Sequence, residues 1–427
     1  MKKTGLQIYP KVVHSFKKEK IYVDLSAVET TSDATVSIRI QPMEKYGTPH
    51  MAFRIDECDR YPYVEMTHEG GGVYSVEHDF IDEQRYSVCV DTGAAKPIKT
   101  YLYAVDDDYA ALRAYKGDTH LHTNRSDGEG YPFEVACAYR SAGFDFIAVT
   151  DHHKMSPSEE ARDAIGALTS AFTVFTGEEV HNKGMGYIHV INFGGKRSVN
   201  TVIENDGDYV SRRLDEIEAS TDFPHGVDTH ACAFKIFIAD EIRRGGGVAL
   251  LAHPFWETYG EYNAQTEDTK FLLKGGYFDA FELLGDCDHT GNGNNLQAAL
   301  WSELRAEGVQ TSIVGSSDAH STTHKTSYFN KSFSIVLAND VSTVPVSIKN
   351  GLSVAVSRRT DKDFYCIGSF RAVKYVRFLM EEYYPEYTAL TAVHAQHLSA
   401  GRKDGITTEL RAAEASIDAF NSKFFSL

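Results

Sequence analysis

Two histidines, His120 and His122, stand two residues apart and are followed by the acidic residue Asp127. On an extended segment alternate side chains point to the same side, so both imidazoles can reach one metal ion. Ser126-Asp127-Gly128 is typical of a tight turn in which Gly128 is free to take a positive φ. A single His-x-His pair is weak evidence, but with a carboxylate so close it indicates a divalent-metal site.

The same residue types recur downstream, each time at or near an apolar run that is typical of a buried strand. Residues 144–150 form one such run and end in Asp151-His152-His153. Further runs are 172–175 before Glu178 and Glu179, 187–191 with His189 inside it, 247–252 before His253, 278–284 before Asp286, and 311–315 before Asp318 and His320. In a parallel α/β sheet or barrel the carboxyl ends of all strands lie on one face. The pattern therefore predicts that these side chains meet in a multinuclear metal centre.

Helices are predicted between these runs. Pro132 can open a helix that Gly143 ends, and Ser156-Pro157-Ser158-Glu159 is a capping box for another. A third is expected from about 296 to 306. Strands that alternate with helices from residue 115 to about 360 predict an α/β domain.

The chain on either side of this region follows different patterns. Residues 1–114 show short alternating segments, which predict a small antiparallel β-sandwich domain. Residues 361–427 are predicted as a helical C-terminal extension, with a role in packing or in a homo-oligomer rather than in catalysis. Residues 194–246 exceed the usual connection length and are expected to be an insertion or lid over the barrel mouth.

Composition excludes several classes of protein. The formal net charge of −17 disfavours a protein that coats nucleic acid, because that requires a broad basic face. The chain shows no run typical of a secretory signal or of a membrane span, so a cytoplasmic location without membrane attachment is expected. Six scattered cysteines without Cys-x-x-Cys spacing indicate reduced thiols rather than a thiolate metal site.

Four motifs together resemble the PHP (polymerase and histidinol phosphatase) family of metal-dependent hydrolases. They are His120-Leu121-His122 with Ser126-Asp127-Gly128, Thr150-Asp151-His152, Gly177-Glu178-Glu179, and Ala252-His253-Pro254 with Ser317-Asp318-Ala319-His320, and His189 accompanies them. The match covers residues 115–360 in the family's order. The resemblance implies a distorted (β/α)7 barrel that carries a trinuclear centre of zinc, manganese or iron. The β domain in front of it is similar to the carbaryl-hydrolase-like branch of the family.

The resemblance also implies which residues bind which ion. The implied first set is His120, His122, Glu179 and Asp318; the second is the bridging Glu179 with His189 and His253; the third is Asp127, His152 and His320. Two to three divalent ions are therefore expected.

Neighbouring residues compete for some of these positions. Strand alternation cannot place both His152 and His153 in the centre, and Glu178 competes likewise with Glu179. The family pattern favours His152 and Glu179. His181 is also available, but His189 was expected to lie on the apolar strand.

Other polar residues near these motifs are candidates for supporting roles. Asp151 is expected to orient a ligand or hold the structure. Arg125, Lys154 and Lys325 stand beside ligands and are candidates for binding an anionic substrate, and His324 is a candidate proton donor. His225 and His230 of the insertion are weaker candidates for substrate contact.

The expected function is that of a metal-dependent phosphoesterase. Metal-bound hydroxide would attack a small phosphorylated metabolite or nucleotide, with Glu179 and Asp318 as central ligands of the catalytic centre. A hydrolase of carboxylic or carbamic esters on the same centre is the first alternative, and a non-catalytic metal-bearing interaction domain is the second. The expected partner is a small molecule, and nucleic acid is expected only as short nucleotides.

Overall fold

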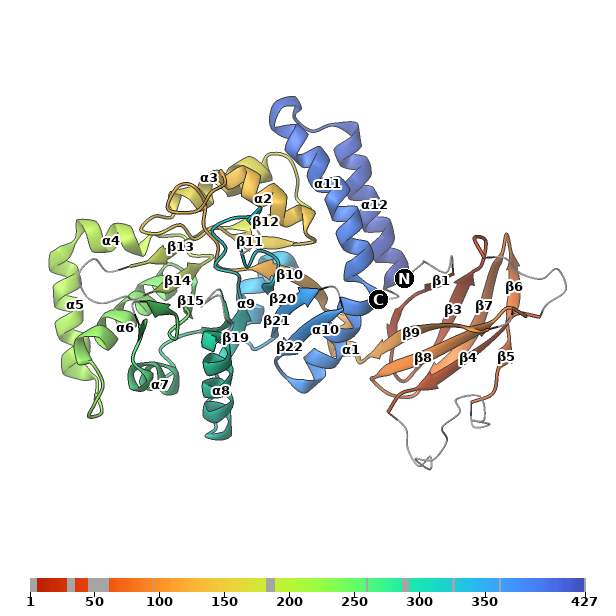
Figure 1. The fold of residues 1–427 in the computed structure, drawn as a ribbon, viewed down its shortest axis with the longest axis horizontal. Coiled ribbons are helices and arrows are strands. Elements are labelled where there is room, and N and C mark those ends of the chain that lie inside the picture. Colours follow the sequence, from red (N-terminus) through yellow and green to blue (C-terminus); the bar gives the residue numbers. More distant parts are fainter. Residues whose placement is uncertain are drawn as a thin grey trace. The chain divides into compact units, whose positions relative to one another are not determined.

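The computed structural model describes residues 6–28, 35–44, 61–94, 96–181, 189–258, 260–285, 292–324, 327–360 and 362–425. The chain forms two compact units (Figure 1). The first comprises Met1–Arg113, Arg377–Tyr383 and Ala415–Leu427, and the second comprises Ala114–Val376 and Tyr384–Glu414. All histidines and acids predicted to bind metal lie in the second unit.

The first unit contains two β-sheets, of order β1-β3-β7-β6 and β2-β9-β8-β4-β5. The strands are β1 (Gln7–Tyr9), β2 (Val12–His14), β3 (Lys17–Asp24), β4 (Ser37–Pro42), β5 (Val64–Glu65), β6 (Thr67–Gly70), β7 (Val73–Phe80), β8 (Arg85–Asp91) and β9 (Ile98–Val105), followed by the short helix α1 (Asp107–Ala110). Described strand pairs are antiparallel except β2 with β9. Alternate side chains such as Ile38 and Val88 form one hydrophobic core. The β-rich N-terminal region predicted from alternation is thus confirmed.

The second unit contains two large sheets and a small one. The six-stranded sheet has the order β12-β11-β10-β20-β21-β22, and the five-stranded sheet has the order β13-β14-β15-β18-β19. Their strands are β10 (Arg113–Asp118), β11 (Phe146–Ala148), β12 (Thr173–Phe175), β13 (Gly177–Val180), β14 (Val190–Phe193), β15 (Val248–Leu251), β18 (Ala280–Leu284), β19 (Ser312–Gly315), β20 (Ser332–Ala338), β21 (Ser353–Thr360) and β22 (Asp363–Ile367); β16 (Glu257–Thr258) and β17 (Glu261–Tyr262) form a hairpin.

A shared apolar core lies between the two large sheets. It contains Phe146 of β11 and Val336 of β20 from one sheet, and Ile191 of β14 and Leu250 of β15 from the other. The sheets approach most closely at Gly315, where an added Cβ would lie 2.5 Å from the Phe333 carbonyl oxygen. Burial of these alternate side chains drives the two sheets together.

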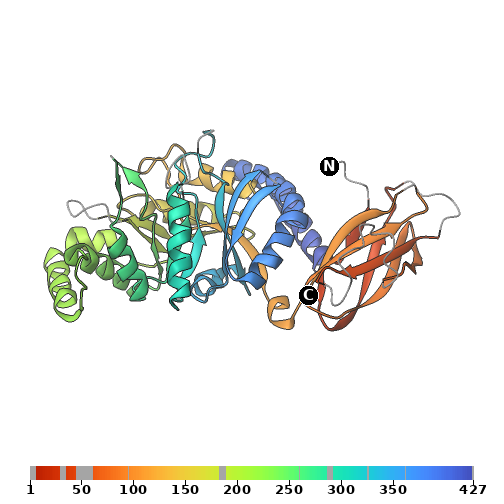
Figure 2. The same cartoon turned by 60° about the horizontal axis from the view of Figure 1, so that its bottom comes forward.

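Helices surround the sheets (Figure 2). They are α2 (Pro132–Ser141), α3 (Ser156–Gly166), α4 (Val199–Asn205), α5 (Gly207–Ser220), α6 (Thr229–Arg244), α7 (Thr266–Lys274), α8 (Asn292–Ala306), the 3-10 turn η2 (Val341–Thr343), α9 (Val344–Lys349), α10 (Phe370–Glu382), α11 (Tyr384–Asp404) and α12 (Thr408–Phe424). Helix α6 packs Phe237 and Ile238 against a second core with Leu251 and Phe281, on the opposite face of the five-stranded sheet from the shared core. This part of the 194–246 segment is therefore a layer of the fold, and the expected lid over the barrel mouth stays a prediction.

The expected distorted (β/α)7 barrel is borne out as a mixed α/β arrangement. Among the described residues of the second unit, the hydrogen-bonded ladders form two large sheets and a two-stranded one, and isolated bridges join the large sheets at Leu121–Ala319 and His152–Glu179. Strand β14 is antiparallel to both β13 and β15, and β21 is antiparallel to β20 and β22. The parallel direction assumed for strands in this region does not hold at β14 or β21, because periodicity reveals a strand but not its direction.

The chain after residue 360 is not a purely helical extension. Strand β22 adds to the six-stranded sheet, and only then do α10, α11 and α12 follow. Helix α11 packs against α2 within the second unit. Among the described helices, none combines the length and apolar character needed to cross a membrane.

Candidate metal centre

His120 and His122 extend from the end of strand β10. The His122 N–H donates to the Ala319 carbonyl at 3.0 Å, and the Asp318 N–H donates to the His120 carbonyl at 2.9 Å. This pairing keeps the segment extended, so both imidazoles lie on one side. The Nε2 atoms of His120 and His122 are 3.2 Å apart, as the spacing predicted.

The turn after His122 is fixed by the buried carboxylate of Asp151. Its Oδ1 accepts hydrogen bonds from the N–H groups of Thr123 (2.9 Å) and Ser126 (3.1 Å), and its Oδ2 accepts one from the Thr123 hydroxyl at 2.6 Å. Gly128 is needed for close approach, since a Cβ there would lie 2.6 Å from the His122 carbonyl oxygen. Gly128 does not have the positive φ that was expected. Asp151 thus positions the turn that carries Asp127.

Glu179 lies in β13 at the middle of the cluster, and its two carboxylate oxygens face different groups of histidines. Oε2 is 3.3 Å from His120 Nε2, 3.2 Å from His122 Nε2 and 2.9 Å from His152 Nδ1. Oε1 is 2.7 Å from His189 Nδ1 and 3.6 Å from His253 Nε2. A carboxylate between two groups of donors is arranged as a bridging ligand would be.

The competing neighbours point elsewhere. The Glu178 carboxylate accepts hydrogen bonds from Asn192 Nδ2 (3.0 Å), Asn200 Nδ2 (2.9 Å) and the Val199 N–H (2.6 Å). It lies on the opposite side of β13 from Glu179. His152 contacts Asp127 and Glu179, whereas His153 has a φ of 63° and donates its backbone N–H to the Glu179 carbonyl. The cluster therefore contains Glu179 and His152.

Asp318 follows β19 and has a φ of 48°, an uncommon backbone conformation for a residue other than glycine. Its Oδ1 lies 3.1 Å from His120 Nε2 and 3.0 Å from His122 Nε2. Its Oδ2 lies 3.8 Å from His253 Nε2. Such strained backbone is often found at functional sites.

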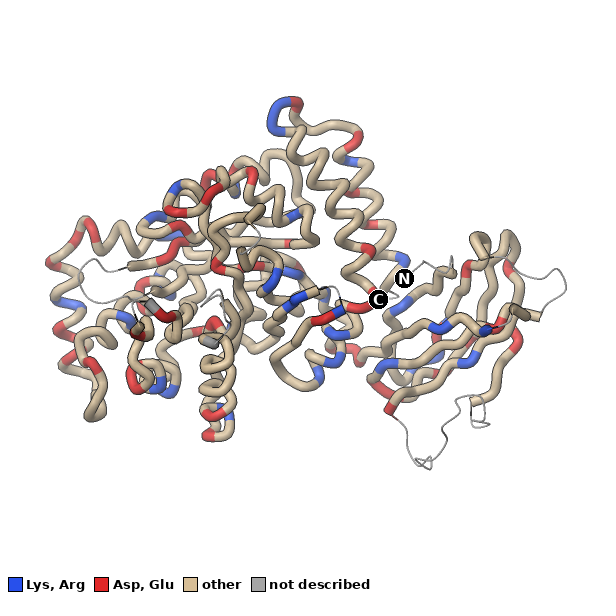
Figure 3. Tube along the Cα trace, in the orientation of Figure 1, with Lys and Arg blue, Asp and Glu red and all other residues tan. Residues whose placement is uncertain are grey.

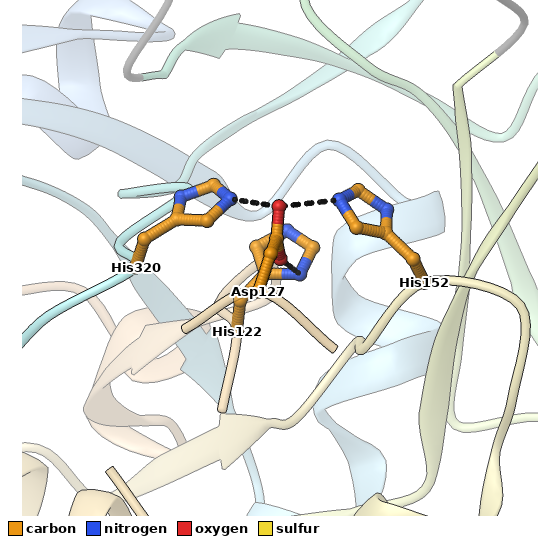
Figure 4. Close-up of side chains that lie close together, drawn as sticks. All are labelled: His122, Asp127, His152 and His320. Atoms are coloured by element: carbon orange, nitrogen blue, oxygen red, sulfur yellow. Dashed lines mark ion pairs between the residues drawn. The ribbon is translucent and has the colours of Figure 1, made fainter. Parts of the chain in front are cut away.

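Asp127 collects a third group of histidines (Figure 4). Its Oδ2 is 3.3 Å from His152 Nε2 and 3.2 Å from His320 Nε2, and its Oδ1 is 3.7 Å from His122 Nδ1. His122 therefore faces both this group and the Glu179 group. The family resemblance implied that it binds the first ion alone.

His189 reaches the cluster from an unexpected direction. It immediately precedes β14 instead of lying within a strand, and residues 187 and 188 of the expected strand lie outside the described residues. Because β14 runs antiparallel to β13, its amino-terminal end lies at the carboxyl end of β13. The reversal is what brings His189 to the cluster.

Charges within the cluster shift the pKa values of its members. Burial disfavours a charged imidazole, but the carboxylates of Asp127 and Glu179 outweigh it and raise the pKa of His152 to about 10. The pKa of His320 rises to about 9, because Asp127 and Asp318 likewise outweigh burial. For His189 burial dominates and lowers the pKa to about 3. The neutral imidazole favoured at His189 is the form that binds metal.

The carboxylates shift in the opposite sense. Burial alone would raise the pKa of Glu179, but His189 and His120 hold it well below its ordinary value. His120 and His122 likewise outweigh burial and lower the pKa of Asp318. Both groups are therefore ionised at neutral pH, as metal ligands must be.

The donor set fits divalent metal ions. Groups within metal-binding distance include His122-Asp127-His152-His320, His120-His122-Asp318 and His120-Glu179-His253. Among the described residues, both oxygens of Glu179, Oδ1 of Asp318 and Nδ1 of His152 are buried without a hydrogen-bond partner. Buried polar atoms are rarely left so, and several of them facing one another indicate a bound ion. Imidazole and carboxylate ligands without thiolate suit zinc, manganese or iron.

Predicted substrate-binding residues lie near the cluster but have partners of their own. The Arg125 guanidinium pairs with Glu160, with Nε to Oε2 at 3.0 Å and Nη2 to Oε1 at 2.8 Å. Lys154 Nζ donates to the Arg125 carbonyl at 2.7 Å. His324 is exposed, and Lys325 lies outside the described residues. Their roles in substrate binding or proton transfer stay predictions.

His225 and His230 of the 194–246 segment are also exposed, and His230 Nδ1 lies 2.6 Å from Glu218 Oε1. Their predicted contact with substrate stays a prediction.

Sequence reasoning missed Glu282. It lies in β18, is fully buried, and places its Oε2 2.8 Å from His120 Nδ1. This contact orients the imidazole so that Nε2 faces Glu179 and Asp318, a common arrangement around metal-binding histidines. The available signal was a single carboxylate inside an otherwise apolar run.

Comparison with solved structures finds distant similarity. No protein-family model and no curated protein sequence matches the chain. A two-domain protein from Bacteroides vulgatus containing a predicted PHP-like metal-dependent phosphoesterase matches with 16% identity and a TM-score of 0.38, over 57% of this chain and 65% of that one. This chain thus spans less than two thirds of that relative.

Two further structures show similarity of the same order. One, from Bifidobacterium adolescentis, is assigned as a metal-dependent phosphoesterase (16% identity, TM-score 0.36, covering 49% of this chain and 89% of that one). The other is an amidohydrolase from Chromobacterium violaceum (18% identity, TM-score 0.32, covering 48% and 87%). The chain is therefore similar, over about half its length, to PHP-like metal-dependent phosphoesterases and amidohydrolases, and it carries buried His, Asp and Glu clusters suited to metal.

Proposed function

We propose that the chain is a metal-dependent phosphoesterase that hydrolyses a small phosphorylated molecule at a centre of two or three divalent ions, zinc, manganese or iron. The observation that carries this proposal is the position of Glu179. Its Oε2 faces His120 and His122, and its Oε1 faces His189 and His253. A carboxylate placed in this way can be shared by the neighbouring ions of a two-metal hydrolytic centre.

Nine side chains would hold the ions in three groups. The first group is His120, His122 and Asp318 with Glu179 Oε2; the second is His189 and His253 with Glu179 Oε1; the third is Asp127, His152 and His320. Divalent ions in such centres supply Lewis acidity, polarise phosphoryl oxygens and lower the pKa of bound water.

The charge balance favours a phosphorylated substrate. The nine side chains include three carboxylates, and two or three divalent ions would more than neutralise them. The loaded centre would then be positive within a protein of net charge −17. A phosphate ester, with its two negative charges, is the small-molecule class that gains most from such a site.

Residues around the cluster would position the ligands rather than react. Glu282 holds His120 by Nδ1, and Asp151 holds the turn that carries Asp127. The buried Asp118 accepts hydrogen bonds from the N–H groups of His120 (3.2 Å) and Ser317 (3.1 Å). Each of these three carboxylates holds a segment that carries predicted ligands in place, which pre-organises the centre.

The second unit also contains a cleft whose size suits a small molecule. A cleft of about 980 Å³, within the range for small-molecule sites, is lined by Leu284, Lys331, Arg359 and Tyr365 among others. None of the nine predicted ligands lines it. Its lining residue Leu284 accepts a hydrogen bond from the N–H of Ser316, two residues before Asp318, at 2.8 Å.

The distribution of charge supports a small-molecule partner rather than nucleic acid. In the view of Figure 3, Lys and Arg are interspersed with Asp and Glu along the chain. Binding along a nucleic-acid backbone usually requires a continuous basic surface.

Metal analysis of the purified protein, paired with hydrolysis of p-nitrophenyl phosphate and p-nitrophenyl acetate, tests the proposal. Two to three ions per chain with release of phosphate are expected. Metal binding with cleavage of the acetate ester alone would instead assign a carboxylic ester hydrolase. A protein that binds no metal and gains no activity from added manganese would contradict both.

The variants Glu179→Gln and Glu178→Gln form a matched pair for this test. Glu179→Gln should lose metal and at least about 100-fold of the activity, since an amide is a poor bridging ligand. Glu178→Gln should keep its metal but lose about 1–3 kcal/mol of stability, because Glu178 accepts several buried hydrogen bonds. Full metal content and rate in Glu179→Gln would refute the assignment.

A further inference from the structure

His181 lies beside the proposed centre but belongs to none of its three ligand groups. It directly follows β13 and is two residues beyond Glu179, so the alternation of an extended chain places both side chains on one side. Its backbone N–H lies 3.4 Å from Asn200 Oδ1, which tethers it to the start of α4. Its side chain is 18% exposed.

The contacts of this imidazole point into the cluster. Its Nε2 lies 3.7 Å from Glu179 Oε1, and its ring centroid is 4.1 Å from that of His189 and 4.4 Å from that of His152. Nε2 is also buried without a hydrogen-bond partner among the described residues. This buried nitrogen has a carboxylate oxygen and two imidazoles as neighbours. Such neighbours are those expected around the nitrogen atom of a metal ligand.

We propose that His181 is an additional metal ligand on the Oε1 side of Glu179, an inference that rests on the metal centre of the proposed function. The ion there would be held by Glu179, His181, His189 and His253. Three imidazoles and one carboxylate make a four-ligand set supplied entirely by the protein, which suits tetrahedral zinc.

With His181 as a ligand, the ions would differ in the exposure and in the number of their protein ligands. In the third group, the side chain of Asp127 is 52% exposed, that of His152 is 20% exposed and that of His320 is 41% exposed. Glu179, His189 and His253 are 6% exposed or less. With His181 this ion would have four protein ligands, as many as the first ion has in His120, His122, Asp318 and Glu179, so a chelator should remove it later than the exposed ion at Asp127.

The test measures metal affinity rather than activity. Metal-free wild type, His181→Ala and the control His230→Ala are titrated with Zn²⁺ against a competing chelator, and their Co²⁺ forms are compared by visible absorption. His230 is a suitable control because it is 48% exposed and pairs with Glu218. His181→Ala should weaken one of the tight Zn²⁺ sites by about 10- to 100-fold and lower the intensity of the tetrahedral Co²⁺ bands. His230→Ala should behave as wild type.

A second variant, His181→Gln, keeps a polar side chain and is less prone to a folding defect. Thermal unfolding in chelator shows whether each variant is folded. If a folded His181 variant binds Zn²⁺ as tightly as wild type and gives the same Co²⁺ spectrum, the proposal is overturned. A wild type without a tight Zn²⁺ site would overturn it too. Phosphatase activity is scored separately, so a metal-binding protein without it would contradict the proposed function alone.

Discussion

At the scale of single residues, the cluster around Asp127 makes stability depend on both pH and metal. The folded-state pKa values of His152 and His320, about 10 and about 9, lie above the ordinary value of 6.5. Without metal, the paired imidazolium groups therefore stabilise the fold fully below pH 6.5, and this contribution is lost as pH rises through about 9 to 10. Bound metal must displace the same protons.

We predict opposite pH trends for the two forms. In chelator, the midpoint of thermal unfolding should fall as pH rises from 6.5 to 10, whereas the increment in midpoint produced by added metal should grow over the lower part of that range. Asp127→Asn removes the carboxylate that pairs with both histidines and should flatten the first trend. A metal-free wild type whose stability rises with pH would contradict the assignment of these ion pairs.

Many of the residues in the metal-binding cluster could be predicted from sequence. His120 and His122 follow from strand alternation, and His253, Asp318 and His320 follow from their place after apolar runs. Glu282 could not be singled out, because its partner His120 is 162 positions away and no local pattern links them. Arg125 was selected for its charge, but its pairing with Glu160 depends on where α3 lies.

At the scale of secondary-structure elements, the turn between β10 and α2 depends on one side chain. Asp151 receives hydrogen bonds from the backbone and the hydroxyl groups of Thr123 and Ser126. It follows β11, so it ties the end of one strand to the turn that continues from another. The positions of Asp127 and of His122 depend on this link.

We predict that Asp151→Ala lowers the free energy of unfolding by about 1–3 kcal/mol and weakens metal binding, because it leaves buried N–H groups without acceptors. Urea unfolding in chelator and metal titration measure the two effects. Ser126→Ala removes one of the hydrogen bonds and should have a smaller effect, and Asp163→Ala, at a side chain 70% exposed, should have almost none. Unchanged stability in Asp151→Ala would show that the turn holds without this anchor.

Strand direction was the main element-level feature beyond the reach of the sequence. The run before His189 identified a strand near the right place, but nothing in it reveals that β14 is antiparallel to its neighbours. The 194–246 segment was long for a connection, and its apolar positions in α6 proved to cover the sheet. Loop length alone does not distinguish a lid from a packed layer.

At the scale of the whole molecule, the two units are assembled from segments far apart in sequence. The second unit includes Tyr384–Glu414, and α11 in this segment packs against α2. Gly143 permits close approach there, because a Cβ at this position would lie 2.5 Å from Thr388 Oγ1. The region after residue 361 was predicted to be helical, but the partner of α11 could not be predicted, since complementary surfaces cannot be matched from spacing alone.

A buried polar network fixes α11 in place. Arg140 of α2 is fully buried, and its Nη1 donates to the Phe144 carbonyl at 2.9 Å and to the Tyr387 hydroxyl at 3.2 Å. The Tyr387 hydroxyl in turn donates to the Asp145 carboxylate, and Arg140 Nε lies 3.2 Å from His394 Nδ1. Buried charged groups depend on such hydrogen-bond partners.

We predict that Tyr387→Phe lowers the free energy of unfolding by about 1–3 kcal/mol, because Arg140 and Asp145 then lose a shared partner in a buried setting. Metal content should stay the same, since the predicted metal ligands are not part of this network. Urea unfolding and metal analysis of the same preparation measure both, with Tyr365→Phe, at a residue 56% exposed, as the matched control. A stable Tyr387→Phe would mean that apolar packing of α11 suffices, and a loss of metal would mean that this helix also positions the centre.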